Sequence, residues 1–496
     1  MTYSIDYAAL APEIILALTV MGVLTVDVLV PRRLKYWSAV VALGGMLLSA
    51  AAILMLVLDG SGASMFDGSY VVDNFSLTFK ALFLAAGYVV LLMSVGYIES
   101  DRYYQGEYYF LLVSSILGSL VMSSARGFIV MFIGLELVTA PLFMLAGWRK
   151  GDKRSNEAAL KYFLLGVLSA AILGWGMSFV FGLTGEVRFD AVAQGMAQAI
   201  GDSATRPAAI VAILFVIAGF GFKISAVPFH FWAPDTYEGA PTPVTAYLAV
   251  SSKAAGFVGL IVVVYRAFGA VGEIWGPALW LMAAVSMTVG NLTALNQKNI
   301  IRMLAYSSVA QGGFMLVPFA AAAASDGAIA PAAVSATVVY LAIYLFMNLG
   351  AFAFILAASK YTKSGDIESY AGLSTRAPGL AVLGVVFFFS LAGIPPLAGW
   401  FAKFVMFSTA IGAKNTWGWT LGVIAAVNAV IAFYYYARVV KAMWFDAASS
   451  EVESEAVVGG SLKLALALCT VAVFVLGVLP GLASTIGDTA AQLLGG

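Results

Sequence analysis

Long apolar segments recur along the whole chain, and they constrain its fold more than any other feature. We expect about fourteen of them, each close to the length that a helix needs to cross a lipid bilayer. The approximate spans are residues 10–30, 37–58, 75–97, 107–124, 127–148, 157–183, 207–232, 241–267, 277–296, 299–319, 333–358, 379–412, 417–445 and 461–482. With 62% hydrophobic and only 10% charged residues, a soluble domain could not bury this much apolar surface. The sequence therefore predicts an all-α polytopic membrane protein, with a short surface helix or loop at 187–201.

Lysine and arginine residues are distributed unevenly between alternate loops. One set of loops carries Arg32, Arg33, Lys35, Arg102, Arg149, Lys150, Lys153, Arg154, Lys298, Arg302, Lys360, Lys363, Arg376, Arg438, Lys441 and Lys463. The opposite set carries only Lys80, Arg126, Arg188, Arg206, Arg266 and Lys414. Because basic loops stay in the cytoplasm, the first set is expected there and both termini are expected on the outer side.

Charged residues inside the apolar segments are the best indication of function. Glu136, Lys223, Lys253 and Lys403 lie near the middle of spans, and Lys161 lies just inside one. An ionised group at mid-membrane costs several kcal/mol or more, so these side chains should face the protein interior or trapped water. Desolvated ammonium and carboxylate groups take up and release protons readily. A series of them across one membrane protein suggests a proton or ion path.

Three spans contain prolines that should interrupt them. The motifs are KISAVPFHFWAPD from Lys223, GAPTPVTAY from Gly239 and LAGIPPLAGWFAKF from Leu391. Proline removes a backbone donor and frees a carbonyl, which then needs water or a side chain. Transporters build ion sites at such breaks, in corresponding places of two halves.

A weak internal similarity points the same way. The segment from Gly118 resembles the segment from Gly290, and in that register Glu136 falls opposite Ser308. In the first and third motifs a tryptophan follows a proline at the same spacing. A true repeat and chance similarity both remain open, and five spans per copy would make the copies inverted.

Simpler roles exist for several of these residues. Lys161 is near the cytoplasmic end of its span, where a lysine can extend to the surface or join a structural ion pair. Glu136 could serve only as a counter-ion. The single histidine, His230, follows a proline and suits either a helix-break stabiliser or a proton relay. The acidic stretch 451–455 is typical of a solvated loop, and could also contact a peripheral arm.

Composition excludes several function classes. One cysteine, Cys469, cannot ligate an iron–sulfur cluster alone, and one histidine cannot form a bis-histidine haem site. No P-loop or dinucleotide fingerprint occurs, and no basic block suggests nucleic acid.

Three stretches resemble a known family. Residues 223–256, 296–315 and 390–404 are similar to the antiporter-like subunits of the proton-pumping NADH:quinone oxidoreductase, respiratory complex I. That family includes the subunits L, M and N and the Mrp-type cation/proton antiporters. Lysine rather than glutamate at position 403 is unlike subunit M, and the absence of a long lateral helix expected beyond about residue 482 is unlike subunit L. The chain is therefore most similar to the subunit N group.

The resemblance implies a domain organisation. Residues 107–273 and 274–445 would be two inverted five-helix repeats with broken helices. Residues 1–106 would be flanking transmembrane helices, and residues 446–496 a loop and a last transmembrane helix.

The resemblance also implies roles for the charged residues. Glu136 would pair electrostatically with Lys223, Lys253 would link two half-channels, and Lys403 would be the exit-side proton site. Lys161 and His230 would belong to an auxiliary hydrated path.

The resemblance implies partners as well. The chain would hold no cofactor, because NADH, FMN, iron–sulfur clusters and quinone would belong to partner subunits. It would contact other membrane subunits, including antiporter-like neighbours, and the lipid of a bacterial plasma (inner) membrane.

The competing functions are an Mrp-type sodium/proton antiporter subunit and a membrane scaffold. Sodium sites favour converging carboxylates and carbonyls, so the excess of deep lysines favours protons.

Overall fold

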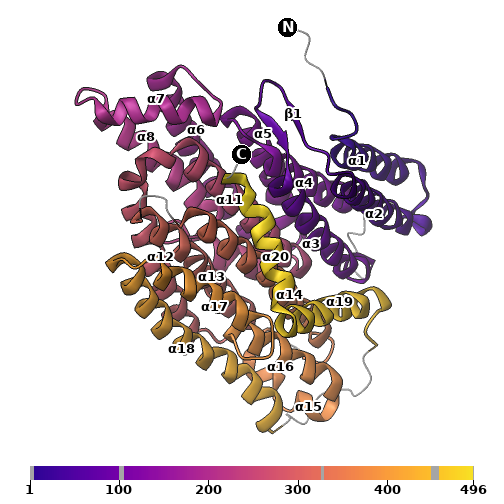
Figure 1. Cartoon of the computed structure of the whole chain (residues 1–496). Coiled ribbons are helices and arrows are strands. Elements are labelled where there is room, and N and C mark those ends of the chain that lie inside the picture. Colours follow the sequence, from indigo (N-terminus) through magenta and orange to yellow (C-terminus); the bar gives the residue numbers. More distant parts are fainter. Residues whose placement is uncertain (1–4, 100–105, 326–328, 363, 448–456, 495–496) are drawn as a thin grey trace.

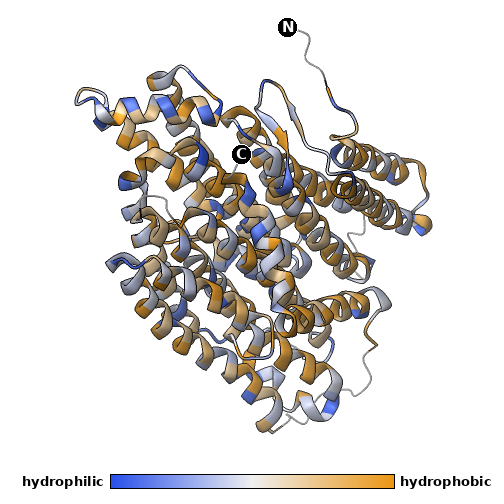
Figure 2. Ribbon diagram, viewed as in Figure 1, coloured by the Kyte–Doolittle hydropathy of each residue, from blue (hydrophilic) through white to orange (hydrophobic). Residues whose placement is uncertain are grey.

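The computed structural model describes residues 5–99, 106–325, 329–362, 364–447 and 457–494. Arg102, Lys363 and the acidic stretch 451–455 lie outside the described residues. Thirteen helices of the described chain are long and apolar enough to cross a membrane, and α16 (Pro378–Ala392) is a shorter apolar helix. Hydrophobic residues dominate the helices, and hydrophilic ones concentrate in loops and at helix ends (Figure 2). The predicted all-α polytopic architecture is therefore confirmed (Figure 1).

Three helices and a small hairpin precede the first set of five crossings. They are α1 (Ala11–Leu29), η1 (Arg32–Leu34), α2 (Tyr36–Asp59), β1 (Ala63–Met65), β2 (Tyr70–Val72) and α3 (Asn74–Glu99). The hairpin was not predicted, because two strands of three residues leave no clear sequence pattern.

The next five crossings form one set. Its elements are α4 (Glu107–Ser124), α5 (Phe128–Ala146), α6 (Lys153–Thr184), α7 (Phe189–Gly201), α8 (Arg206–Lys223), α9 (Trp232–Gly239), α10 (Thr242–Tyr247), η2 (Leu248–Ser252), α11 (Lys253–Val262) and η3 (Val263–Ala267). The helix α7 is the predicted surface segment, and it packs its apolar side against the bundle.

A second set of five crossings follows, and then a C-terminal helix pair. The elements are η4 (Gly269–Val271), α12 (Gly272–Leu295), α13 (Ile300–Ala323), α14 (Ala330–Ala358), η5 (Ile367–Tyr370), α15 (Leu373–Arg376), α16 (Pro378–Ala392), α17 (Gly399–Gly412), α18 (Thr416–Phe445), α19 (Gly460–Val478), α20 (Pro480–Ala491) and η6 (Gln492–Leu494). The predicted boundary between residues 273 and 274 falls in the first turn of α12.

The two sets share a local backbone feature. Gly127, just before α5, forms an isolated antiparallel bridge with Arg188 after α6. Asn299, just before α13, forms the same bridge with Asp366 after α14. Since α12 is the fifth crossing after α4, corresponding helices of the two sets run in opposite directions.

Two of the three expected helix breaks occur where the sequence placed them. The helix α8 ends at Lys223 and α9 begins at Trp232, while α16 ends at Ala392 and α17 begins at Gly399. The third expectation was wrong in position. Its prolines lie at the start of α10, where proline fits a helix, and the irregular part is the π-helical turn η2.

The last predicted span, 461–482, corresponds to α19, which is a candidate membrane span over Gly460–Val478, and a further helix, α20, follows it and was not predicted. The helix α19 ends at Val478, and Pro480 starts α20, which lies along α14 (Figure 1). The hydroxyl of Ser335 on α14 donates to Asp488 on α20 over 2.8 Å. The helix α19 packs on the break between α16 and α17, where the Ala398 N–H donates to the Val473 carbonyl over 3.0 Å.

Candidate functional site

Lys223 is the last residue of α8, and its side chain turns into the bundle at the break. Only 4% of the residue is exposed, so its ammonium needs a partner inside the protein. That partner is the Thr139 hydroxyl on α5, which accepts a hydrogen bond from Nζ. Sequence reasoning missed Thr139, because one hydroxyl in an apolar helix resembles many others.

Glu136 lies one turn before Thr139 on α5 and is half-buried. It lines a groove of about 620 Å³ between α5 and α6, together with Phe132, Val167, Ala170, Ala171, Gly174, Trp175 and Ser178. Its Oε1 atom is buried without a hydrogen-bond partner among the described residues. The carboxylate interacts electrostatically with Lys223, although no ion pair within 4 Å joins these two described residues.

Lys253 is the first residue after the π-helical turn η2 and is 1% exposed. Its Nζ donates to the Ser308 carbonyl, and also to the Ser308 hydroxyl over 2.6 Å. Ser308 belongs to α13, so a lysine of the first set is held by the second set. Gly312 lies one turn further on: a Cβ added there would be 3.1 Å from the Ile224 carbonyl and 3.7 Å from Lys253 Nζ.

Lys403 is on α17, beyond the break, and is 6% exposed. Its Nζ donates over 2.6 Å to the carbonyl of Ala392, the last residue of α16. The proline break frees such carbonyls, so the lysine satisfies an acceptor that the helix cannot. Nζ also lies 5.4 Å from the ring centroid of Phe314 on α13.

Buried polar side chains fill the space between Lys253 and Lys403. Next to Ser308, the Tyr344 hydroxyl donates to its Oγ over 3.1 Å. One turn along α13, Gln311 accepts from the Tyr340 hydroxyl over 2.6 Å and donates to the Leu391 carbonyl over 3.4 Å. Leu391 precedes the residue that holds Lys403, so one pair of polar side chains lies beside Lys253 and the other near Lys403, and no hydrogen bond between described residues joins the two pairs.

Lys161 has a different environment. It is 42% exposed and pairs with Glu157 and Asp235, each over 2.6 Å. Asp235 also pairs with Arg302 over 2.9 Å, and Arg302 pairs with Glu238 over 2.8 Å. Burial raises the pKa of Asp235, but Lys161 and Arg302 outweigh it and hold the pKa below its usual range. This network favours the structural role for Lys161, and its role in proton transfer stays a prediction.

His230 lies between α8 and α9 and is 6% exposed. Its Nδ1 atom has no hydrogen-bond partner among the described residues, and its ring lies 4.6 Å from that of Phe231. Both sequence-based alternatives for this residue remain predictions.

A fourth lysine of the described chain, Lys80, is buried within the spans, although the loop pattern had placed it on the outer side. Lys80 lies in the second turn of α3, is 0% exposed, and pairs with Glu13 of α1 over 2.8 Å. Its position inside the predicted span 75–97 was the signal that should have identified it.

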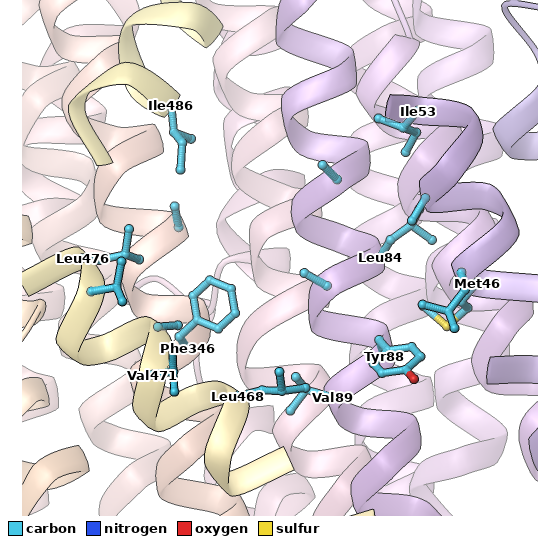
Figure 3. A pocket seen from close by; sticks show the side chains of 17 residues that line it. Met46, Ile53, Leu84, Tyr88, Val89, Phe346, Leu468, Val471, Leu476 and Ile486 are labelled. Carbon is cyan, nitrogen blue, oxygen red and sulfur yellow. The ribbon is translucent and has the colours of Figure 1, made fainter. Parts of the chain in front are cut away.

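An apolar groove of about 590 Å³ lies away from these charges (Figure 3). Side chains of α2 and α3, including Met46 and Leu84, face Phe346 of α14 and Leu468 of α19 across it. Tyr88 supplies its one hydroxyl, so it offers no series of titratable groups.

Comparisons with known proteins agree with this geometry. The family described as "NADH:quinone oxidoreductase/Mrp antiporter, TM" matches residues 125–428. The NADH-quinone oxidoreductase subunit N of Trichlorobacter lovleyi is 38% identical over 99% of this chain and 98% of its own. A chain of respiratory complex I from Thermus thermophilus is 32% identical, with a TM-score of 0.77 over 96% of this chain and 98% of that one. A chain of an Mrp complex from Dietzia sp. has a TM-score of 0.85 at 18% identity, over 99% and 98% of the two chains.

Proposed function

We propose, because this chain belongs to the family of transmembrane subunits shared by NADH:quinone oxidoreductases and Mrp antiporters, that it is a membrane-arm subunit that moves protons. The protons would pass along Glu136, Lys223, Lys253 and Lys403. Redox chemistry in partner subunits would supply the energy, and this chain would carry no redox centre of its own.

One observation carries the proposal. Three lysines, each at most 6% exposed, are held by hydroxyls or backbone carbonyls and not by carboxylates. A buried lysine locked to a carboxylate would stay charged, whereas neutral partners allow both protonation states. Such lysines can load and unload protons.

The contacts support an order of proton transfer from Lys223 through Lys253 to Lys403. Glu136 is close enough to Lys223 to act on its charge but is not bonded to it, so movement of either group changes the attraction. Coulomb energies in a partly wet site are on the order of a few kcal/mol, enough to load or release a proton. Lys253 and the network around Gln311 would pass the proton on to Lys403.

The test uses the whole complex reconstituted into vesicles. We expect Lys223→Ala, Lys253→Met and Lys403→Met each to reduce proton pumping strongly, with the complex still assembled. Lys463→Met is the matched control, because that lysine is exposed at the start of α19. Normal pumping by all three variants, at matched complex levels, would refute the proposal.

A second function has one observation in its favour, the fold shared with a chain of an Mrp complex. A sodium/proton antiporter would show pumping or exchange that depends on sodium and not on NADH. Co-purification of the chain with NADH:quinone oxidoreductase activity decides between the two.

A further inference from the structure

A row of serines follows one face of α4. Ser115, Ser119 and Ser123 recur at one-turn intervals, and none of them has exposed surface. Ser115 and Ser119 lie 3.3 and 3.5 Å from the hydroxyl of Tyr247, on the same interrupted span as Lys253. Each serine also bonds a nearby backbone carbonyl, which explains how it is tolerated but not why all three share a face.

The row leads to the end of α4, which is the outer end in the predicted orientation. There Arg126 donates over 3.1 Å to the Ser123 carbonyl and pairs with Asp73 over 2.7 Å. Asp73 is 31% exposed, so the polar row reaches the protein surface.

Beside this end lies a buried cluster that the proposed mechanism does not use. The cluster consists of Glu13, Tyr70, Lys80 and Ser124, all at least nine-tenths buried. Glu13 and Lys80 form the 2.8 Å ion pair, and the Tyr70 hydroxyl lies beside Glu13 and Ser124. Asp73 and Arg126 are the other charged groups that face it.

The cluster contains more polar atoms than its own residues satisfy. Lys80 Nζ and Glu13 Oε1 satisfy each other in the 2.8 Å ion pair, but Glu13 Oε2, the Tyr70 hydroxyl and Ser124 Oγ are buried without a hydrogen bond of good geometry among the described residues. Buried polar atoms are nearly always hydrogen-bonded, and unpaired ones are costly. Several in one place are the usual environment of ordered water, which bonds two to four such groups.

We propose that this cluster binds water and, with the serine face of α4, forms a second outward proton route that branches from the path at Tyr247 and Lys253. The route rests on the proposed function and adds an exit that does not pass Lys403. Serines one turn apart have Cβ atoms about 5–6 Å from each other, a gap that one water bridges. Each transfer moves one proton between oxygen or nitrogen atoms, so no other bond changes. The fixed charge of Arg126 opposes retention of an extra proton at the outer end.

The first test compares two serines of one helix in the reconstituted complex. Ser119→Ala interrupts the row, whereas Ser114→Ala is the control, because Ser114 bonds only the Phe110 carbonyl and is not part of the row. We expect the proton-to-NADH ratio of Ser119→Ala to fall between those of Ser114→Ala and Lys253→Met, by roughly twofold relative to the control. If Ser119→Ala matches the control while Lys253→Met is impaired, the route is wrong and the proposed function stands. An unimpaired Lys253→Met also overturns the route, and the proposed function fails with it only if Lys223→Ala and Lys403→Met are unimpaired as well.

The second test separates a proton site from a structural ion pair. Replacing both charges with apolar side chains, as in Glu13→Leu with Lys80→Met, often leaves stability unchanged. We expect this double variant to assemble and to pump less than the Ser114→Ala complex. Assembly with unchanged pumping would make the pair structural and overturn the route.

A third measurement does not depend on any variant. A cryo-EM map of the intact complex that resolves water should show ordered water at Glu13, Lys80 and along the serine face. A cluster that is dry in such a map contradicts the proposal.

Discussion

The Thr139 hydroxyl offers a sensitive test of the proposed proton path, because it is the hydrogen-bond partner of Lys223 and its removal leaves the charged residues Glu136 and Lys223 in place. Thr139→Val keeps the shape and removes the hydroxyl. A hydrogen bond to a charged group contributes about 1.5–3 kcal/mol, and about 1.4 kcal/mol is a factor of ten. We therefore expect the charged form of Lys223 to be populated roughly 10- to 100-fold less, and pumping to fall steeply.

Thr139→Ser is the matched control. It keeps the hydroxyl and loses one methyl group, at a cost of about 1 kcal/mol in packing. Proton uptake by vesicles containing the complex, and NADH:quinone turnover, should be measured for both variants at equal complex levels. We expect Ser to retain most activity and Val to retain little. Equal pumping by the two variants would show that the hydroxyl does not control Lys223.

Three further predictions address other parts of the path. We expect Glu136→Gln to impair pumping more than Glu136→Asp, because only Gln removes the charge that acts on Lys223; equal activities would contradict this. We expect Gly312→Ala to lower pumping without loss of assembly, since its new Cβ presses on the Ile224 carbonyl near Lys253, whereas at the control site Gly422→Ala an added Cβ meets nothing within 4 Å. We expect Asp235→Asn to lower the free energy of unfolding of the complex by about 1–2 kcal/mol at both pH 6 and pH 8. Its lowered pKa keeps Asp235 ionised there, and the stabilisation is lost only as pH falls through that native value, so equal stability of wild type and variant at either pH would count against it.

The sequence predicted the features that follow from apolar length and proline chemistry. The spans and the breaks after Lys223 and Ala392 are where the patterns placed them, because a proline in mid-helix has few other outcomes. The prolines of α10 led to a wrong position for the third break, because a proline at the start of a helix does not interrupt it. The π-helical turn before Lys253 has no comparable signature in sequence.

Partners of the charged residues could not be predicted in the same way. Thr139, Ser308 and Gln311 are single polar residues in apolar helices, and their importance depends on which helix faces them. Lys80 was different. Its span was predicted, but the residue was counted with the loop that precedes α3, because it lies near the start of that helix. Its pairing with Glu13 depends on the packing of α1 against the rest, which no local pattern specifies.

The two five-helix sets share a backbone but have different chemistry at matching positions. In the register that aligns the bridge residues before α5 and α13, Glu136 corresponds to Ser308 and Thr139 to Gln311. The acid of the first set is thus replaced, in the second, by the hydroxyl that holds Lys253. Lys253 follows the break of one set but bonds the helix of the other, so a change in its charge acts on both. We therefore expect a change in the protonation of Lys253 to alter the contact between the two sets, because its Nζ holds Ser308 of the second set.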